Sequence, residues 1–327
     1  MKALRFHGAG DLRLEELPIP DPGPGEARIR PQAVGVCGTD AHIFRGEFPA
    51  AVPVTLGHEI GGVVDAVGAA VQSLHAGDLV TIQPNTFCAA CRFCRGGREH
   101  LCESMRAYGV HMNGGFAEAM TASARNVYRL PEGIGAGIGC FAEPLACCVH
   151  GMDRLAMRSG ASVLVIGAGA VGLMLTRLAR LAGAGHITVS EPNERRRTAA
   201  AEFGADRTAA PDAIEGEFDY AIDAVGSQST FEQAVSRAAR GGAILVFGAA
   251  PAHAAATVRP YDIFARELTI VGSLINPYTH TRAVELLPQM GLERLNVKAF
   301  PLARYREAFE TQSLAAGATK VLFLPQE

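Results

Sequence analysis

Neither sign of charge is in large excess in this chain, and long apolar runs are missing. Lys and Arg number 30 against 33 Asp and Glu, so the formal net charge is −3, which gives no electrostatic reason to expect nucleic acid or an anionic membrane surface as a partner. No stretch approaches the roughly 20 consecutive apolar residues of a membrane span. The residues from Met1 to Gly8 mix charged with apolar side chains, unlike a signal peptide. We therefore expect a cytoplasmic location and no membrane or nucleic-acid partner.

The residues that are present are typical of a globular protein. Hydrophobic residues make up 48% and charged residues 19% of the 327 positions. A chain of this length is expected to form two domains rather than one. Eight cysteines are present, and in a reducing compartment clustered cysteines are more often metal ligands than disulfides.

Four of the cysteines fall within fifteen residues. Their spacings of three, three and eight residues allow four thiolates to close a tetrahedral shell around one Zn²⁺. A closed shell is structural, so the sequence predicts a structural zinc held by Cys88, Cys91, Cys94 and Cys102. Three further cysteines lie in an apolar segment and are predicted to be buried side chains: Cys140, Cys147 and Cys148.

A second candidate metal set lies outside this cluster and has mixed ligand chemistry. It consists of Cys37, His58, Glu59 and Glu143. A zinc that reacts with an alcohol must keep one position open, so it has fewer fixed protein ligands than a structural zinc. One thiolate, one imidazole and one carboxylate would suffice, and the set predicts a catalytic zinc.

Polar residues that follow Cys37 could serve the same site. Thr39 can both donate and accept a hydrogen bond, and His42 can pass a proton to water near neutral pH. Asp40 is a candidate partner that fixes the tautomer of a ligand imidazole. Two of them also have a simpler interpretation: His42 as an ordinary surface or core histidine, and Asp40 as a helix cap.

The pattern of the chain changes near residue 162. Before it, the chain is rich in turns and short strands, with an extended connector at residues 18–24 and strands expected at 27–34, 61–67 and 78–82. After it, strands expected at 163–166, 186–190, 220–223, 243–247 and 268–271 alternate with helices expected at 173–182 and 193–203. This alternation predicts an α/β fold with a doubly wound parallel sheet.

A glycine-rich turn follows the first of these later strands. Gly167, Gly169 and Gly172, with Ala170 and Val171 between them, open the expected helix, which is the context of a dinucleotide-binding turn. Glu191 ends the next strand, where a carboxylate can bind a ribose diol and repel a 2′-phosphate. NAD is therefore favoured over NADP. Arg195 or Arg196 could cover the adenine or hold a phosphate. The candidate cofactor contacts also include Val225 and Gly226.

Taken together, these motifs resemble the zinc-dependent medium-chain dehydrogenase/reductase family. The match runs in the family's order through Cys37-Gly-Thr39-Asp40-x-His42, Gly57-His58-Glu59, the four-cysteine cluster, Glu143-Pro-Leu and the glycine turn. The His-Glu and Glu-Pro-Leu segments look most like its sorbitol (polyol) and threonine dehydrogenases. The resemblance implies zinc ligands at Cys37, His58 and Glu59, with Glu143 binding directly or through water. It also implies a proton relay through Thr39 and His42.

The family resemblance further implies the domain organisation. It predicts a β-rich, GroES-like catalytic domain formed by residues 1–145 and 275–327, and a Rossmann-type dinucleotide-binding domain at 146–274. Two zinc ions per chain, one catalytic and one structural, and a homo-oligomer, either tetramer or dimer, are expected.

The reaction expected from these features is zinc-dependent hydride transfer from a secondary alcohol of a polyol or sugar alcohol to NAD, which gives a ketone. Polyol enzymes often carry an Arg-Tyr pair where this chain has Ser273-Leu-Ile-Asn276-Pro-Tyr278, so the particular polyol stays open. One alternative is oxidation of a β-hydroxy amino acid, as in threonine 3-dehydrogenases. An alternative from another class is a non-catalytic zinc-ribbon binding protein.

Overall fold

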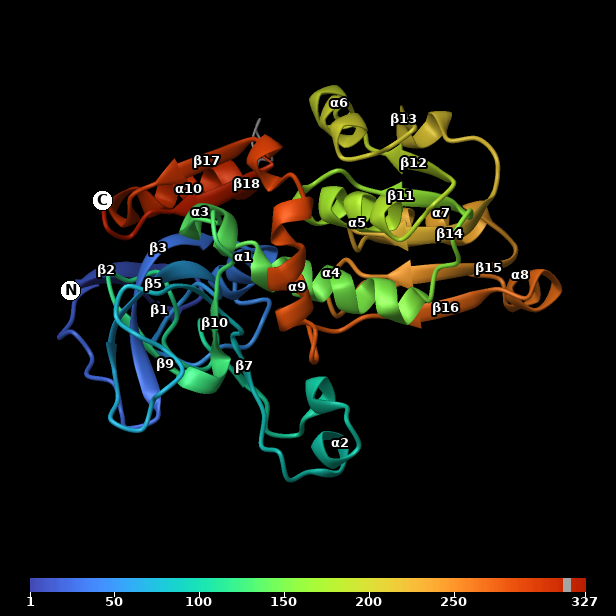
Figure 1. Ribbon diagram of the computed structural model, residues 1–327. Coiled ribbons are helices and arrows are strands. Elements are labelled where there is room, and N and C mark those ends of the chain that lie inside the picture. Colours follow the sequence, from blue (N-terminus) through green and yellow to red (C-terminus); the bar gives the residue numbers. More distant parts are fainter. Residues whose placement is uncertain (314–318) are drawn as a thin grey trace. The chain divides into compact units, whose positions relative to one another are not determined.

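The chain forms two compact units, one of them discontinuous in sequence (Figure 1). The computed structural model describes residues 1–313 and 319–327. Unit 1 comprises Met1–Ala146 and His280–Glu327, and unit 2 comprises Cys147–Thr279. The boundaries expected from the sequence lay at 145/146 and 274/275, so the first boundary of the structure lies one residue later and the second lies five residues later. None of the described helices is both long and apolar enough to cross a membrane.

Unit 1 is built mainly on strands. Its largest sheet has the order β10-β6-β5-β3-β18-β17, with β9 also paired to β3. In β3 (Glu26–Gly35) buried and more exposed residues alternate as far as residue 33, as the sequence predicted, because successive side chains of a strand point to opposite faces, and the last three residues are all buried. The other strands of this sheet are β5 (Glu59–Val67), β6 (Leu79–Ile82), β9 (Met120–Ser123), β10 (Val127–Arg129), β17 (Val297–Phe300) and β18 (Lys320–Phe323).

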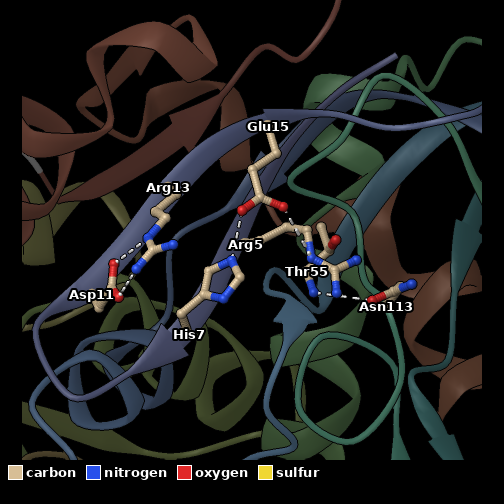
Figure 2. Close-up of polar contacts among 7 residues, drawn as sticks. All are labelled: Arg5, His7, Asp11, Arg13, Glu15, Thr55 and Asn113. Atoms are coloured by element: carbon tan, nitrogen blue, oxygen red, sulfur yellow. Dashed lines mark hydrogen bonds and ion pairs between the residues drawn. The ribbon is translucent and has the colours of Figure 1, made fainter.

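A smaller sheet contains the β1–β2 hairpin, whose outer face carries ion pairs. The sheet is formed by β1 (Lys2–Gly8), β2 (Asp11–Glu16) and β4 (Val54–Thr55). Figure 2 shows that Arg13 contacts both oxygens of Asp11 and that His7 Nε2 lies 2.6 Å from Glu15 Oε1. Such solvent-exposed pairs contribute little to stability, because water screens the charges. The hairpin is held mainly by its buried face, which includes Leu4.

Short helices and a small hairpin complete unit 1. The two-stranded sheet of β7 (Asn85–Thr86) and β8 (Arg106–Ala107) joins the four-cysteine segment to the rest of the unit. The helices are α1 (Gly38–Phe44), α2 (Arg92–Arg95), α3 (Ala136–Gly139), α9 (His280–Leu286) and α10 (Tyr305–Ser313), and α4 (Ala142–Leu155) begins in unit 1 and continues into unit 2.

Unit 2 contains one six-stranded sheet in which every pairing is parallel. The strand order is β13-β12-β11-β14-β15-β16. Successive strands are thus added on one side of β11 and then on the other, as in doubly wound dinucleotide-binding folds. This confirms the predicted α/β class. The strands are β11 (Ser162–Ile166), β12 (His186–Ser190), β13 (Arg207–Ala209), β14 (Phe218–Asp223), β15 (Ala238–Val246) and β16 (Thr269–Gly272), and the helices are α5 (Ala170–Leu181), α6 (Glu194–Glu202), α7 (Gln228–Arg237) and α8 (Pro260–Arg266).

Two predictions need correction. Helix α5 begins at Ala170, three residues before the start expected from its apolar pattern, because Gly169 adopts an extended N-cap conformation and the last residues of the turn are already helical. Of the three cysteines predicted to be buried, Cys140 and Cys148 are buried, but Cys147 is half-buried. Burial raises the pKa of the Cys140 thiol, so that side chain stays protonated and unreactive at neutral pH.

Candidate active site

Three side chains from two neighbouring strands of unit 1 converge at one point. The potential ligand atoms of Cys37, His58 and Glu59 all lie within 4.8 Å of one another. Strand pairing explains why: Gly35 at the end of β3 lies opposite Glu59 at the start of β5. Cys37 follows the first strand by two residues, and His58 directly precedes the second. Residues 22 positions apart in sequence are thereby brought together.

Gly57 lets the chain enter β5 with His58 in this position. Its φ of +90° lies in the left-handed region that favours glycine, and a Cβ there would come within 2.5 Å of the Phe116 ring. Glycine at this position therefore allows both the backbone conformation and the close packing that place the candidate ligand His58.

Asp40 connects the cysteine to the histidine. Its Oδ2 accepts a hydrogen bond of 2.8 Å from the backbone N–H of Cys37, the N-cap residue of α1. Its Oδ1 lies 3.5 Å from His58 Nδ1. Asp40 is fully buried. Helix cap and imidazole partner were alternative interpretations of this residue, and the geometry accommodates both.

The electrostatics of this cluster favour a cation. Burial lowers the pKa of His58, but the Asp40 carboxylate and the Cys37 thiol raise it more, and the net pKa lies well above the usual value. Neither His58 Nδ1 nor Asp40 Oδ1 has a hydrogen-bond partner at normal distance among the described residues. A thiolate, an imidazole and a carboxylate within this distance fit a zinc ion with an open position.

Glu143 does not belong to this group of three. It lies buried in the first turn of α4, but its carboxylate is not within 4.8 Å of all three ligand atoms. Contact with the metal through a water molecule, the second possibility implied by the family resemblance, stays a prediction.

Lys320 is a residue of the site that the sequence analysis missed. Its Nζ donates a hydrogen bond of 2.7 Å to Glu59 Oε1, and both residues are buried. Burial lowers the pKa of Lys320, but Glu59 and the Cys37 thiol raise it more, so the amine is charged. The available signal was weak: Lys320 is the one charged residue in β18, whose four residues are all buried.

The two predicted relay residues, Thr39 and His42, both lie on α1. Thr39 is half-buried. His42 Nδ1 lies 2.6 Å from Glu47 Oε2 and 3.1 Å from Arg45 Nη2, with 29% of its side chain exposed to solvent. Arg45 and, to a smaller degree, His42 lower the pKa of Glu47 to about 2. His42 therefore has a charged carboxylate beside it and direct access to water.

The four predicted structural-zinc ligands also lie together. The sulfurs of Cys88, Cys91, Cys94 and Cys102 are all within 4.8 Å of one another. Backbone N–H groups of Ala90 and Cys91 donate to the Cys88 sulfur at 3.4 and 3.3 Å, and these bonds lower its pKa. Preformed N–H···S contacts stabilise thiolates, so the loop fits a closed zinc shell of four cysteines.

Unit 2 contains a cavity of about 570 Å³ at the predicted nucleotide turn. Four of the predicted cofactor residues line it: Gly167, Glu191, Arg196 and Val225. The other five, Gly169, Ala170, Val171, Gly172 and Gly226, are not among its lining residues. At Gly172, a Cβ would approach Gly167 O to 2.0 Å, so this glycine allows helix and turn to pack closely.

Glu191 is anchored at the wall of this cavity. Its Oε2 accepts a hydrogen bond of 2.8 Å from Ala168 N, and its Oε1 accepts one of 2.9 Å from Asn193 N. A second carboxylate, Asp223, accepts from Val225 N and Gly226 N at 3.0 and 3.1 Å and was not predicted. Acidic side chains thus organise the loops that follow β11, β12 and β14.

Comparison with known proteins identifies relatives over the whole chain. Residues 23–132 match the family model described as "Alcohol dehydrogenase GroES-like domain", and residues 170–289 match "Zinc-binding dehydrogenase". The chain is 34% identical to D-altritol 5-dehydrogenase of Agrobacterium fabrum, covering 99% of each chain. It is also 34% identical to L-threonine 3-dehydrogenase of Saccharopolyspora erythraea, covering 95% of each.

Solved structures agree with these matches. A protein of Sinorhizobium meliloti 1021, described as a zinc-binding dehydrogenase bound to NADP, is 36% identical, with a TM-score of 0.95 and 99% of each chain covered. The GroES-like and Rossmann-type parts of the predicted fold are thereby confirmed, as is the assignment to an oxidoreductase class. The chain belongs to the zinc-dependent medium-chain dehydrogenase/reductase family.

Proposed function

We propose that this protein is a dehydrogenase with two zinc sites that oxidises a secondary alcohol of a polyol to a ketone and transfers the hydride to NAD. The convergence of Cys37, His58 and Glu59 within 4.8 Å carries the proposal, because a mixed, incomplete ligand set is typical of a catalytic zinc. Relatives named for polyols, including D-altritol and D-arabinitol dehydrogenases, support the substrate class. Unit 1 would be the catalytic domain and unit 2 the cofactor domain.

Each residue of the cluster would have a separate task. Cys37, His58 and Glu59 would hold the zinc, which supplies Lewis acidity toward the alcohol oxygen when it is bound. Asp40 would fix the imidazole of His58 through Nδ1, from which it lies 3.5 Å. Glu143 would act through a water molecule, since its carboxylate lies outside the group of three.

The proton lost by the alcohol requires a route to solvent. Thr39 can accept it and donate its own hydroxyl proton onward, and His42 can release a proton to water from its partly exposed ring. Glu47, 2.6 Å from His42 Nδ1, would stabilise the imidazolium that forms during this transfer. The net reaction gives a ketone, a reduced nicotinamide and one proton in water.

NAD is the coenzyme that the cavity of unit 2 favours. Two carboxylates, Glu191 and Asp212, line the cavity together with one arginine, Arg196. A 2′-phosphate would meet net negative charge there, whereas ribose hydroxyls can donate hydrogen bonds to Glu191. Since a relative has been solved with NADP, the preference needs a direct comparison of kcat/KM for the two coenzymes.

A β-hydroxy amino acid is the second candidate substrate, because a threonine dehydrogenase has the same 34% identity to this chain as the altritol enzyme, over 95% of each chain. A screen of C4 to C6 polyols, inositols and threonine, read as NAD⁺ reduction, separates the two classes. A homo-oligomer, either dimer or tetramer, is proposed only from the family resemblance, and sedimentation would measure it.

The zinc assignment is tested by Cys37→Ser. We expect two zinc ions per wild-type chain and one per variant chain, at least a thousandfold loss of turnover, and unchanged NAD affinity, because unit 2 has its own cavity. Cys147→Ser, a half-buried cysteine outside both clusters, is the matched control. One zinc per wild-type chain would instead favour a non-catalytic zinc-ribbon protein, and normal turnover of the zinc-depleted variant would refute the proposal.

A further inference from the structure

A buried ammonium lies directly against one of the candidate zinc ligands. Lys320 Nζ donates to Glu59 Oε1 at 2.7 Å and also contacts Oε2. Only 8% of the lysine side chain and 2% of the glutamate side chain are exposed. An ammonium has three donors and no acceptor, and a buried one needs a negative partner. The Glu59 carboxylate therefore binds this cation and is also a candidate ligand of the metal.

The fold leaves space specifically for this ion pair. Gly35 lies opposite Glu59 in the β3–β5 pairing and has no side chain of its own. A Cβ there would lie 1.9 Å from Glu59 Oε2 and 2.9 Å from Lys320 Cε. The residue's φ is outside the left-handed region, so glycine is needed here for space and not for backbone conformation.

We propose that Lys320 is a positioning residue that weakens the bond between Glu59 and the zinc and keeps this carboxylate exchangeable. The inference rests on the catalytic zinc proposed above. Lone pairs that bind the ammonium are less available to the metal, and the positive charge opposes a second cation nearby. When zinc is absent, the ammonium neutralises Glu59 and preserves the site. Loss of the charge should therefore strengthen zinc binding and destabilise the zinc-free protein.

Lys320→Met tests this in the full-length enzyme, with Lys298→Met as the matched control. Lys298 is exposed on β17, the strand next to β18. The measurement is the rate at which EDTA removes the zinc that depends on Cys37. We expect at least a tenfold slower loss in Lys320→Met and a larger difference in Tm between zinc-loaded and zinc-free protein. Lys298→Met and the conservative Lys320→Arg should behave like the wild type.

A double variant shows whether Lys320 acts through Glu59. In a Glu59→Gln background, Lys320→Met should change the rate of zinc loss by less than twofold. If Lys320→Met does not fold, Lys320→Gln, which keeps a hydrogen-bond donor without the charge, replaces it. Equal or faster zinc loss from the uncharged variant, as a purely structural ion pair would give, overturns the inference.

The role of Lys320 and the catalytic zinc can be contradicted independently of each other. A wild-type protein with zinc only at the four-cysteine cluster contradicts the catalytic zinc itself. A wild-type protein with both zinc ions, and no change on removal of the lysine charge, contradicts only the role of Lys320.

Discussion

Among single residues, His280 combines full burial with an unusual lack of hydrogen bonds. Neither ring nitrogen has a hydrogen-bond partner within residues 1–313 and 319–327, and the ring centroid lies 4.7 Å from that of Tyr128. Burial lowers its pKa to about 3 from an ordinary value of 6.5. The folded protein therefore keeps this imidazole neutral at pH values where an unfolded chain binds a proton.

This difference predicts acid sensitivity. Between about pH 6.5 and 3, the unfolded state binds one more proton at residue 280, so stability falls as the pH falls, by up to about 1.4 kcal/mol per pH unit. His280→Phe should remove this part of the slope, because phenylalanine can keep the ring contact with Tyr128 without a titratable group. Urea unfolding at several pH values measures it. His75→Phe, at an exposed histidine, is the control, and equal slopes in wild type and His280→Phe would contradict the assignment.

At the scale of elements, the segment between β7 and β8 has little apolar support. Neither α2 nor the short 3-10 helix at Glu99–Leu101 contains a buried residue, although Cys102 itself is buried. Because the segment has little core of its own, we expect a metal to stabilise its structure. The four sulfurs, all within 4.8 Å of one another, are the points at which zinc would hold this loop.

Cys94→Ser should therefore loosen this loop alone. We expect the variant to lose one zinc per chain and to be cleaved by trypsin within residues 88–102 at least tenfold faster, since three arginines lie in that segment. Glu103→Gln, at an exposed neighbouring residue, should keep both the zinc and the wild-type cleavage rate. Unchanged cleavage of a variant shown to lack the metal would mean that packing, and not zinc, holds the loop.

Local patterns predicted these elements to different degrees. The strands of unit 2 follow from short apolar runs bounded by glycine, and β11 and β12 lie within a residue of their expected bounds. The start of α5 was misplaced because the glycine turn passes into the helix without a polar cap. The pairing of β18 with β3 has no local signal and was not predicted; the family resemblance implied only that the C-terminal segment belongs to the first domain.

At the scale of the whole molecule, each unit has its own core. Unit 2 packs Leu164, Ile166 and Ala221 with further apolar residues, and it is continuous in sequence from Cys147 to Thr279. A ligand that binds its cavity should stabilise this unit by mass action. At a hundredfold excess over Kd, the gain is about 2.7 kcal/mol.

NAD should therefore slow amide hydrogen exchange in α5 and β12 by up to about a hundredfold. The four-cysteine loop of unit 1 serves as an internal reference and should show little change. Glu191→Ala should reduce the protection by NAD, because the carboxylate that we propose as the ribose partner is lost, and the proposed discrimination against NADP should fall with it. Protection of the loop equal to that of α5 would contradict a cofactor site formed by the cavity of unit 2.

Some residues and contacts of the candidate site were predicted from the sequence, and others were missed. Cys37, His58 and Glu59 were identified because their residue types and short motifs suit zinc, and the structure brings them within 4.8 Å. Lys320 was missed because a lone lysine 261 residues from its partner gives no pattern. The contact of His42 with Glu47 was missed for a different reason: surface carboxylates near a histidine are common and seldom informative.

The long separation of Glu59 and Lys320 has a consequence for biosynthesis. The nucleotide-binding unit must emerge from the ribosome between the two residues, which takes roughly 13 to 50 s at the usual rates of about 5–20 residues per second. During this interval, a nascent chain exposes a carboxylate, an imidazole and a thiol without their counter-cation. Free zinc, if it is captured then, would bind before the ammonium arrives.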